Sequence, residues 1–280
     1  MNVEIISSAQ NPRIKHLLAL QQKSALRRQE GLFVVEGRRE LEHCIHAGMQ
    51  VECIYCLDPD AITCHLSPVT CQLSPVTCQL HNMVQVTPNV YERIAYRGST
   101  EGVIAVIHTP QARTLDSLLE QKGRGVNGQP LFVVLERVEK PGNLGAVLRS
   151  ADAAQATGVI VCDPLTDLYN PNLIRSSIGA IFTVPTVACT SEQCIAFLKQ
   201  HNIQILTAQL QDSKQYYDTP MTAPTAIVMG TESTGLTDIW RKAADAHIRI
   251  PMLGQLDSLN VSVSAAILLF EAVRQRQAHN

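Results

Sequence analysis

The chain has 280 residues, of which 45% are apolar, and a net charge of −2. This length is sufficient for two domains, because single domains usually contain roughly 100 to 200 residues. Lys plus Arg (23) and Asp plus Glu (25) nearly balance, so any binding of nucleic acid requires a local basic surface rather than an overall positive field. The amino terminus resembles no export signal, and no apolar run reaches the roughly 18 residues of a membrane span. We therefore expect a cytosolic, cytoplasmic protein whose nine cysteines are reduced thiols.

Residues 1–108 are predicted to form a small domain of mixed α/β structure. Apolar residues recur at helical spacing or in short runs rich in Val and Ile, and glycines follow two of the predicted helices. The expected elements are helices over 11–30, ending at Gly31, and over 38–48, and strands over 32–37, 51–57 and 99–107.

The first 40 residues contain seven Lys and Arg against four Glu, which gives this segment a charge of +3. A charge of this kind is found on phosphate-binding surfaces. It is also found on ordinary solvated helix faces, because Lys and Arg are mostly exposed in all proteins. Charge alone leaves both interpretations open.

A seven-residue unit, C-x-L-S-P-V-T, repeats from Cys64 in "CHLSPVTCQLSPVTCQLH". Pro68 and Pro75 are expected to exclude a continuous helix through this repeat. Thiols and imidazoles are the usual zinc ligands, but the spacing matches no common zinc motif, so we expect a loop with a short internal duplication and no metal. The residues considered for such a site were Cys53, Cys56, Cys71, Cys78, His65 and His81.

Residues 109–130 have the composition of a linker, with three glycines shortly before Pro130. Residues 131–280 then alternate between strands rich in Val and Ile and helices, which predicts a parallel sheet covered on both faces. The strands are expected at 131–135, 158–162, 182–187, 203–208, 226–229 and 247–250, and the helices at 143–156, after 170–171, at 191–201 and at 260–275.

Three loops follow strands of this sheet, where parallel α/β proteins usually bind ligands. The first, "PGNLGAVLRSADA", contains neither glycine fingerprint of nucleotide-binding proteins. Its Asn143 is placed to cap a helix, and its Arg149 to form a surface ion pair with Asp152, so neither residue by itself indicates function. The second, "IVMGTESTGL", contains Gly230, where a ligand can approach the backbone closely, beside Glu232.

The third loop, "IRIPMLGQLDSLNVSVSAA", sets an amide and two hydroxyls at the start of a long apolar helix. Asn260, Ser262 and Ser264 can cap that helix or bind a polar or anionic ligand at its amino terminus. One capping residue is enough, so the other two remain candidates for ligand binding.

In order and spacing, the three motifs resemble those of the SpoU/TrmH family of RNA 2′-O-ribose methyltransferases, within the SPOUT superfamily. The resemblance covers about residues 131–276, and residues 1–108 resemble, less specifically, the family's substrate-recognition domain. It implies a SPOUT-type α/β fold in which the carboxyl-terminal segment of domain 131–280 forms a deep trefoil knot. Ordinary patterning does not predict such a knot, because threaded chains are rare.

The resemblance also implies S-adenosylmethionine as methyl donor, bound at Gly230, Ile250 and Leu259. The family's motif arginine is proposed to assist deprotonation of the ribose hydroxyl. A guanidinium is not normally a base, so we assign Arg149 to a phosphate or oxyanion contact, with the RNA phosphate or a water as proton acceptor. The other residues implied in the catalytic site are Asn143, Glu232, Ser258 and Asn260.

Two further implications are a homodimer formed through the knotted domain and an RNA substrate, with ribosomal RNA favoured over transfer RNA. The candidate RNA-binding residues are Arg27, Arg28, Arg38 and Arg39. A nicotinamide or nucleotide enzyme lacks its glycine fingerprint here. A catalytically silent RNA-binding protein of the same fold remains the main alternative.

Overall fold

The computed structural model describes residues 3–70, 82–96, 101–121, 123–231 and 234–278. These residues form two compact units. The first contains residues up to Gln111 together with the later segment Asp167–Thr183, and the second contains Ala112–Thr166 and Val184 onward. The sequence did not indicate that residues 167–183, inside the predicted catalytic domain, group with the first unit.

The first unit is built on a five-stranded mixed sheet in the order β1-β4-β3-β5-β2. Strands β2 and β3 run antiparallel to β5, whereas β4 runs parallel to both β1 and β3. The strands are β1 (Glu4–Ile6), β2 (Leu32–Glu36), β3 (Val51–Cys56), β4 (Met83–Val86) and β5 (Val103–His108). The helices are α1 (Pro12–Gln22), α2 (Ser24–Glu30), α3 (Arg38–His46), α4 (Pro59–Thr70), α5 (Pro88–Ile94), α8 (Pro171–Ser177) and α9 (Ala180–Thr183).

The second unit is built on a seven-stranded sheet in the order β10-β12-β9-β11-β6-β7-β8, and every pairing in it is parallel, which confirms the predicted sheet type. The strands are β6 (Leu131–Glu136), β7 (Gly158–Cys162), β8 (Thr186–Cys189), β9 (Gln204–Ala208), β10 (Lys214–Gln215), β11 (Thr225–Met229) and β12 (Ala246–Arg249). The helices are α6 (Asp116–Leu119), α7 (Pro141–Ala153), α10 (Ser191–Gln200), α11 (Asp238–Ala243) and α12 (Val261–Gln277), with a short 3-10 turn at Tyr216–Asp218.

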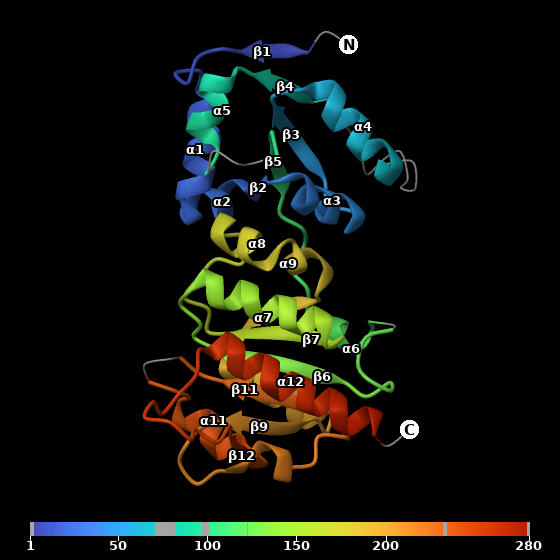
Figure 1. Ribbon diagram of the computed structural model, residues 1–280, viewed down its shortest axis with the longest axis vertical. Coiled ribbons are helices and arrows are strands. Elements are labelled where there is room, and N and C mark those ends of the chain that lie inside the picture. Colours follow the sequence, from blue (N-terminus) through green and yellow to red (C-terminus); the bar gives the residue numbers. More distant parts are fainter. Residues whose placement is uncertain (1–2, 71–81, 97–100, 122, 232–233, 279–280) are drawn as a thin grey trace. The chain divides into compact units, whose positions relative to one another are not determined.

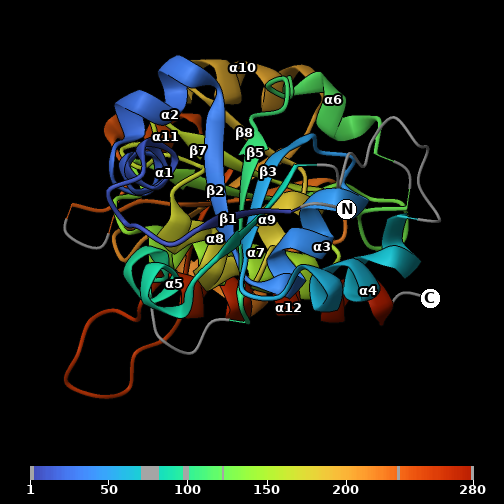
Figure 2. The ribbon, with the colours of Figure 1, turned by 90° about the horizontal axis from the view of Figure 1, so that it is seen from above.

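Helices cover both faces of the second sheet. Alternate residues of a strand point to opposite faces, so Phe132 and Val134 of β6 reach the same core as Phe197 of α10 and Trp240 of α11. Helices α7 and α12 pack against one another, with α12 also contacting β11 (Figure 1). Figure 2 shows α10 and α12 on opposite sides of strands β7 and β8. Because the helices cover the faces of the sheet, the loops that follow the carboxyl ends of the strands are the place where a site can form.

Three expectations about secondary structure were wrong in detail. The helix expected over 11–30 is two helices, because Lys23 between them has an extended backbone; Gly31 does end the second with a left-handed φ of 64°. The segment 182–187 begins as helix α9, and β8 starts only after Pro185, whose ring restricts Val184 to extended conformations.

Pro68 lies inside α4, so the repeat up to Thr70 is helical rather than the expected loop. It occupies the last turn, and the helix ends at Thr70, so only the final backbone bonds are affected. Pro75 and the rest of the repeat, over 71–81, lie outside the described residues. No helix within the described ranges combines the length and apolarity that crossing a bilayer requires.

Candidate active site

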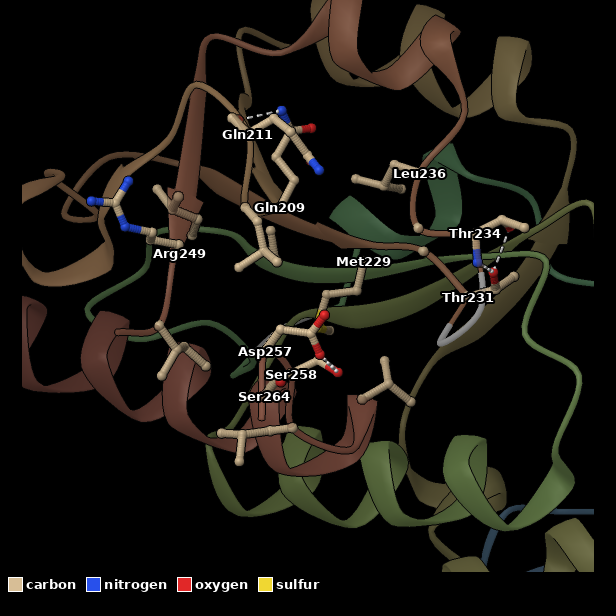
Figure 3. A pocket seen from close by; sticks show the side chains of 18 of the residues that line it. Gln209, Gln211, Met229, Thr231, Thr234, Leu236, Arg249, Asp257, Ser258 and Ser264 are labelled. Atoms are coloured by element: carbon tan, nitrogen blue, oxygen red, sulfur yellow. Dashed lines mark hydrogen bonds between the residues drawn. The ribbon is translucent and has the colours of Figure 1, made fainter. Parts of the chain in front are cut away.

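A cavity of about 360 Å³ opens at the carboxyl edge of the second sheet (Figure 3). It is formed by the chain segments that follow β9, β11 and β12 and by the start of α12. The lining combines apolar side chains, such as Met229 and Leu236, with amides and hydroxyls, such as Gln209 and Ser258. A mostly apolar cleft with a few oriented polar groups is the usual form of a small-molecule site.

All three residues expected to hold the methyl donor line this cavity. Gly230 follows β11, Ile250 follows β12, and Leu259 lies just before α12. Gly230 is 20 residues from Ile250 and 29 from Leu259 in the sequence, and the strand order brings them together because only β9 lies between β11 and β12. Ser258, expected to shape the catalytic site, lines the same cavity.

Gly230 is required by the loop itself. A Cβ there would lie 2.2 Å from the carbonyl carbon and oxygen of Gly235, because the loop closes back on the strand end. Thr231 and Gly235 exchange backbone hydrogen bonds of 3.3 and 3.1 Å, and Gly235 has a left-handed φ of 67°. The sequence suggested that Gly230 allows a ligand to approach, whereas the structure shows that backbone approaches backbone. Glu232, expected in the catalytic site, lies outside the described residues.

The first and third motifs meet through two asparagines. Asn260 caps α12, since its Oδ1 accepts hydrogen bonds from the Ser262 backbone N–H at 2.9 Å and from the Ser262 hydroxyl at 2.6 Å. Its Nδ2 donates to Oδ1 of Asn143 at 3.2 Å, across 117 residues of sequence. The expectation that Asn143 caps α7 was wrong: Lys140 is the cap residue, Pro141 begins the helix, and Asn143 lies in its first turn. The two amides therefore form one polar group at adjacent helix starts, where anions are favoured.

Arg149 lies on the exposed face of α7 and is not among the residues that line the cavity. The expected ion pair with Asp152 was wrong, because Asp152 pairs with Arg124 at 3.1 Å. Within the described part of the chain, Arg149 makes no ion pair, and the residue is exposed. An exposed guanidinium is suited to a fork-like contact with a phosphate from another molecule.

Of the four arginines expected to bind RNA, Arg27 is not available. Its side chain is only 4% exposed, it pairs with Asp167 at 2.7 Å, and it donates to the Leu20 carbonyl at 2.6 Å. It contributes to the core of the first unit because Asp167, 140 residues later, folds onto it. Arg28 and Arg39 are exposed, and Arg38 is half-buried with its Nε bonded to the Glu101 carbonyl.

The sequence missed a fourth loop at this edge of the sheet. Gln209 and Gln211, directly after β9, line the cavity, as does Asp257; Ser264, already a candidate from the sequence, lines it too. The rule that ligands bind beyond the carboxyl ends of parallel strands applies equally to β9 and would have indicated this loop.

The cysteine and histidine residues considered for a zinc site do not gather in the described part of the chain. Cys53 and Cys56 are buried on β3, where Cys53 accepts a hydrogen bond from Arg13 at 3.1 Å. Among the described residues, Cys53, Cys56 and His65 do not belong to any group of three metal-ligating side chains. Cys71, Cys78 and His81 lie outside the described residues.

Comparison with protein families agrees with the motifs. A family model described as "SpoU rRNA Methylase family" matches residues 130–270, half of the chain. The chain belongs to this family. A second model, described as "MRM3-like substrate binding domain", matches residues 11–105. The resemblance noted from the three motifs is thereby confirmed, and it extends to the first unit.

Named relatives of this SpoU family member support the same assignment. It is 37% identical, over 65% of its own length and 72% of the relative, to the 23S rRNA (guanosine-2′-O-)-methyltransferase RlmB of Pseudomonas syringae pv. tomato. A crystal structure of an RNA 2′-O ribose methyltransferase is 38% identical, with a TM-score of 0.79 over 98% of this chain and 99% of that one. The AdoMet-bound rRNA methyltransferase of Sinorhizobium meliloti is 26% identical, with a TM-score of 0.81 over 97% and 98%.

Proposed function

We propose that this protein is a cytoplasmic RNA methyltransferase that transfers a methyl group from S-adenosylmethionine to a ribose 2′-hydroxyl of ribosomal RNA. The observation that supports this most strongly is the cavity beyond β9, β11 and β12, where Gly230, Ile250 and Leu259 meet. The relatives named above act on 23S rRNA or bind AdoMet, which favours ribosomal over transfer RNA.

The cavity fits the methyl donor in size and chemistry. Its volume of about 360 Å³ lies within the range of small-molecule sites, and its apolar walls suit a flat nucleoside base. Backbone groups of Gly230 and Leu259, with the amides of Gln209 and Gln211, offer donors and acceptors for ribose, base and amino-acid groups. Among the described lining residues, Asp257 supplies the one carboxylate, a partner for a cationic group. The donor supplies an electrophilic methyl carbon, and the chain supplies its orientation.

Residues of the first and third motifs hold the RNA. Arg149 contacts a phosphate or the developing oxyanion and orients the ribose, because its guanidinium stays protonated and cannot serve as a base. The paired amides of Asn143 and Asn260 position the ribose, and Ser258 lines the cavity that holds the donor. Glu232 belongs to the same site by its position in the second motif. The ribose proton leaves to a phosphate of the RNA or to water.

A homodimer completes each site. The third motif loop and the start of α12 expose apolar side chains to solvent, with Leu253 97% and Leu256 74% exposed. Val263 and Phe270 extend this surface along α12. Exposing such an apolar patch to water costs free energy, so a second copy of the chain covers it. Arg149 of one subunit then reaches the cavity of the other. The threaded, knotted path of the carboxyl-terminal segment is part of the same proposal.

The first unit binds the RNA through Arg28, Arg38 and Arg39. These side chains add affinity that falls with salt, because each phosphate contact releases counterions. In this proposal the linker 109–130 joins the recognition domain, 1–108, to the catalytic domain, 131–280, of which residues 167–183 group with the first compact unit.

Two measurements test the proposal. Calorimetric titration with S-adenosylmethionine should give one site per chain, and ribosomal RNA from cells lacking the protein should lose a single 2′-O-methyl group.

Arg149→Ala should abolish methylation without weakening donor binding, and Arg149→Lys should restore only part of the activity. Donor binding without any lost methyl group would indicate a different RNA, and absence of donor binding would indicate a silent RNA-binding protein. Wild-type turnover by Arg149→Ala would remove Arg149 from the mechanism.

A further inference from the structure

Three cysteines lie together at the β7–β8 end of the second sheet. Cys162 is the last residue of β7, Cys189 is the last residue of β8, and Cys194 lies in the first turn of α10. Cys162 and Cys189 are direct register partners on neighbouring strands. The three Sγ atoms lie within 4.8 Å of one another, and no other group of three metal-ligating side chains occurs in the part of the chain that the structure describes.

The surroundings leave these thiols to interact with each other. Cys162 and Cys194 are fully buried in the apolar core that includes Val187 and Phe197, whereas Cys189 is half-buried and reaches the surface. Hydrogen bonds from the Cys162 and Cys194 thiols lower the pKa of Cys189 to about 4. The pKa of Cys162 is raised, because its proton is held by hydrogen bonds to the other two sulfur atoms and because it is buried.

We propose that Cys162, Cys189 and Cys194 bind one thiophilic d10 metal ion, Zn²⁺ or Cu⁺. Thiolates are the ligands that these ions select. With a Zn–S bond of about 2.3 Å, tetrahedral geometry places sulfur atoms roughly 3.8 Å apart. The cluster thus needs little rearrangement to reach the bound geometry. On binding, three S–metal bonds form, the remaining S–H protons pass to solvent, and no electrons are transferred.

The two ions differ in what completes the site. Three thiolates satisfy Cu⁺ in a trigonal plane, whereas Zn²⁺ takes a fourth ligand. The exposed side of Cys189 admits water, and the Asp163 carboxylate lies close enough to raise the Cys189 pKa by its charge. Oδ2 of Asp163 accepts a hydrogen bond from the Ser191 hydroxyl at 2.6 Å, which fixes that carboxylate beside the cluster.

This site is separate from the cavity. It joins the edge strand β8 and α10 to β7, whereas the cavity follows β9, β11 and β12 at the other side of the sheet. Its role is structural, because the bound ion would add bonds between β7, β8 and the start of α10, which already pack together. The proposal is independent of the methyltransferase function, and its test uses no activity measurement.

The experiment titrates metal-free, reduced, full-length protein anaerobically with Zn²⁺ and, separately, with Cu⁺, each against a chromogenic chelator. All variants carry Cys64→Ser, Cys71→Ser and Cys78→Ser, so that thiols of the repeat do not contribute. We expect one equivalent of one ion to bind. Cys189→Ser should weaken it by more than the roughly 10- to 100-fold that loss of an outer-sphere partner causes. Cys44→Ala, which removes a buried thiol outside the cluster, should leave the affinity unchanged.

Cys194→Ala provides a second test, and circular dichroism verifies that it folds. If it does not, the number of sulfur ligands is measured on the unsubstituted cluster by X-ray absorption of the bound ion, where three are expected. Absence of stoichiometric binding of both ions, undiminished affinity in Cys189→Ser, or fewer than three sulfur ligands would each overturn the proposal. In those cases the three thiols would be only a hydrogen-bonded part of the core.

Discussion

The buried guanidinium of Arg276 near the end of α12 is expected to hold the carboxyl-terminal helix in place. Its side chain is 2% exposed and donates four hydrogen bonds to backbone carbonyls. The acceptors are Gln129 and Pro130, just before β6, at 2.8 and 3.0 Å, and Met221 and Ala223, before β11, at 2.8 and 2.7 Å. One side chain therefore joins α12 to the segments that precede the two central strands.

The expected size of the effect follows from these contacts. Burial lowers the pKa of Arg276 to about 10, so the group is still charged at neutral pH and all its donors are available. Arg276→Met keeps the apolar stem and leaves four carbonyls without their donor. Each charged hydrogen bond contributes roughly 1.5–3 kcal/mol before the desolvation of the cation is subtracted. Since burial of the cation offsets a large part, we expect the free energy of unfolding to fall by about 3 kcal/mol.

Urea unfolding followed by circular dichroism measures this difference. Arg149→Met is the control, because Arg149 also lies on a helix but is exposed and makes no ion pair with the described residues, and it should leave the transition unchanged. Arg276→Lys should fall between the wild type and Arg276→Met, since an ammonium cannot reach four acceptors at once. If Arg276→Met unfolds at the same urea concentration as the wild type, the carbonyls are satisfied without the guanidinium and the reasoning is wrong.

Three further predictions follow from the site, the first unit and the cysteine cluster. Gly230→Ala should lower the free energy of unfolding by roughly 1–3 kcal/mol and weaken S-adenosylmethionine binding, because the new Cβ would lie 2.2 Å from backbone atoms of Gly235. In the control Gly254→Ala, no atom lies within 4 Å of the new Cβ, so this variant should be as stable as the wild type. Arg27→Met should lower the free energy of unfolding by about 3–5 kcal/mol, because it leaves Asp167 without its ion-pair partner. Arg28→Ala should keep the stability of the wild type and reduce the salt dependence of RNA binding. Equal stability of the two variants would contradict the ion pair of Arg27. In metal-free protein, Cys189 should react with iodoacetamide at nearly the same rate between about pH 6 and pH 8, because its pKa is lowered to about 4. The rate for a peptide thiol falls about tenfold per pH unit below its pKa of roughly 8.5. A tenfold change per pH unit at Cys189 would refute the hydrogen-bonded thiolate.

Much of the second unit could be predicted from sequence, because its signals are local. The apolar run at 158–162 coincides with β7, and the alternation of strands and helices correctly indicated a parallel sheet. A strand or helix depends mainly on spacing within some ten residues, so a single segment contains the information. The three motifs also placed Gly230, Ile250 and Leu259 in one site, and all three line the cavity.

What the sequence could not determine was which distant residues meet. Charge placed Arg27 on an RNA-binding surface, but its depth depends on Asp167, 140 residues away in the chain. The bond between Asn143 and Asn260 and the cluster around Cys162 likewise arise from the order in which strands lie in the sheet. Composition, periodicity and motifs determined the elements, the family and the set of motif residues. Only the tertiary structure decided burial and partners, because these depend on packing between segments whose separation in sequence carries no information about their distance in space.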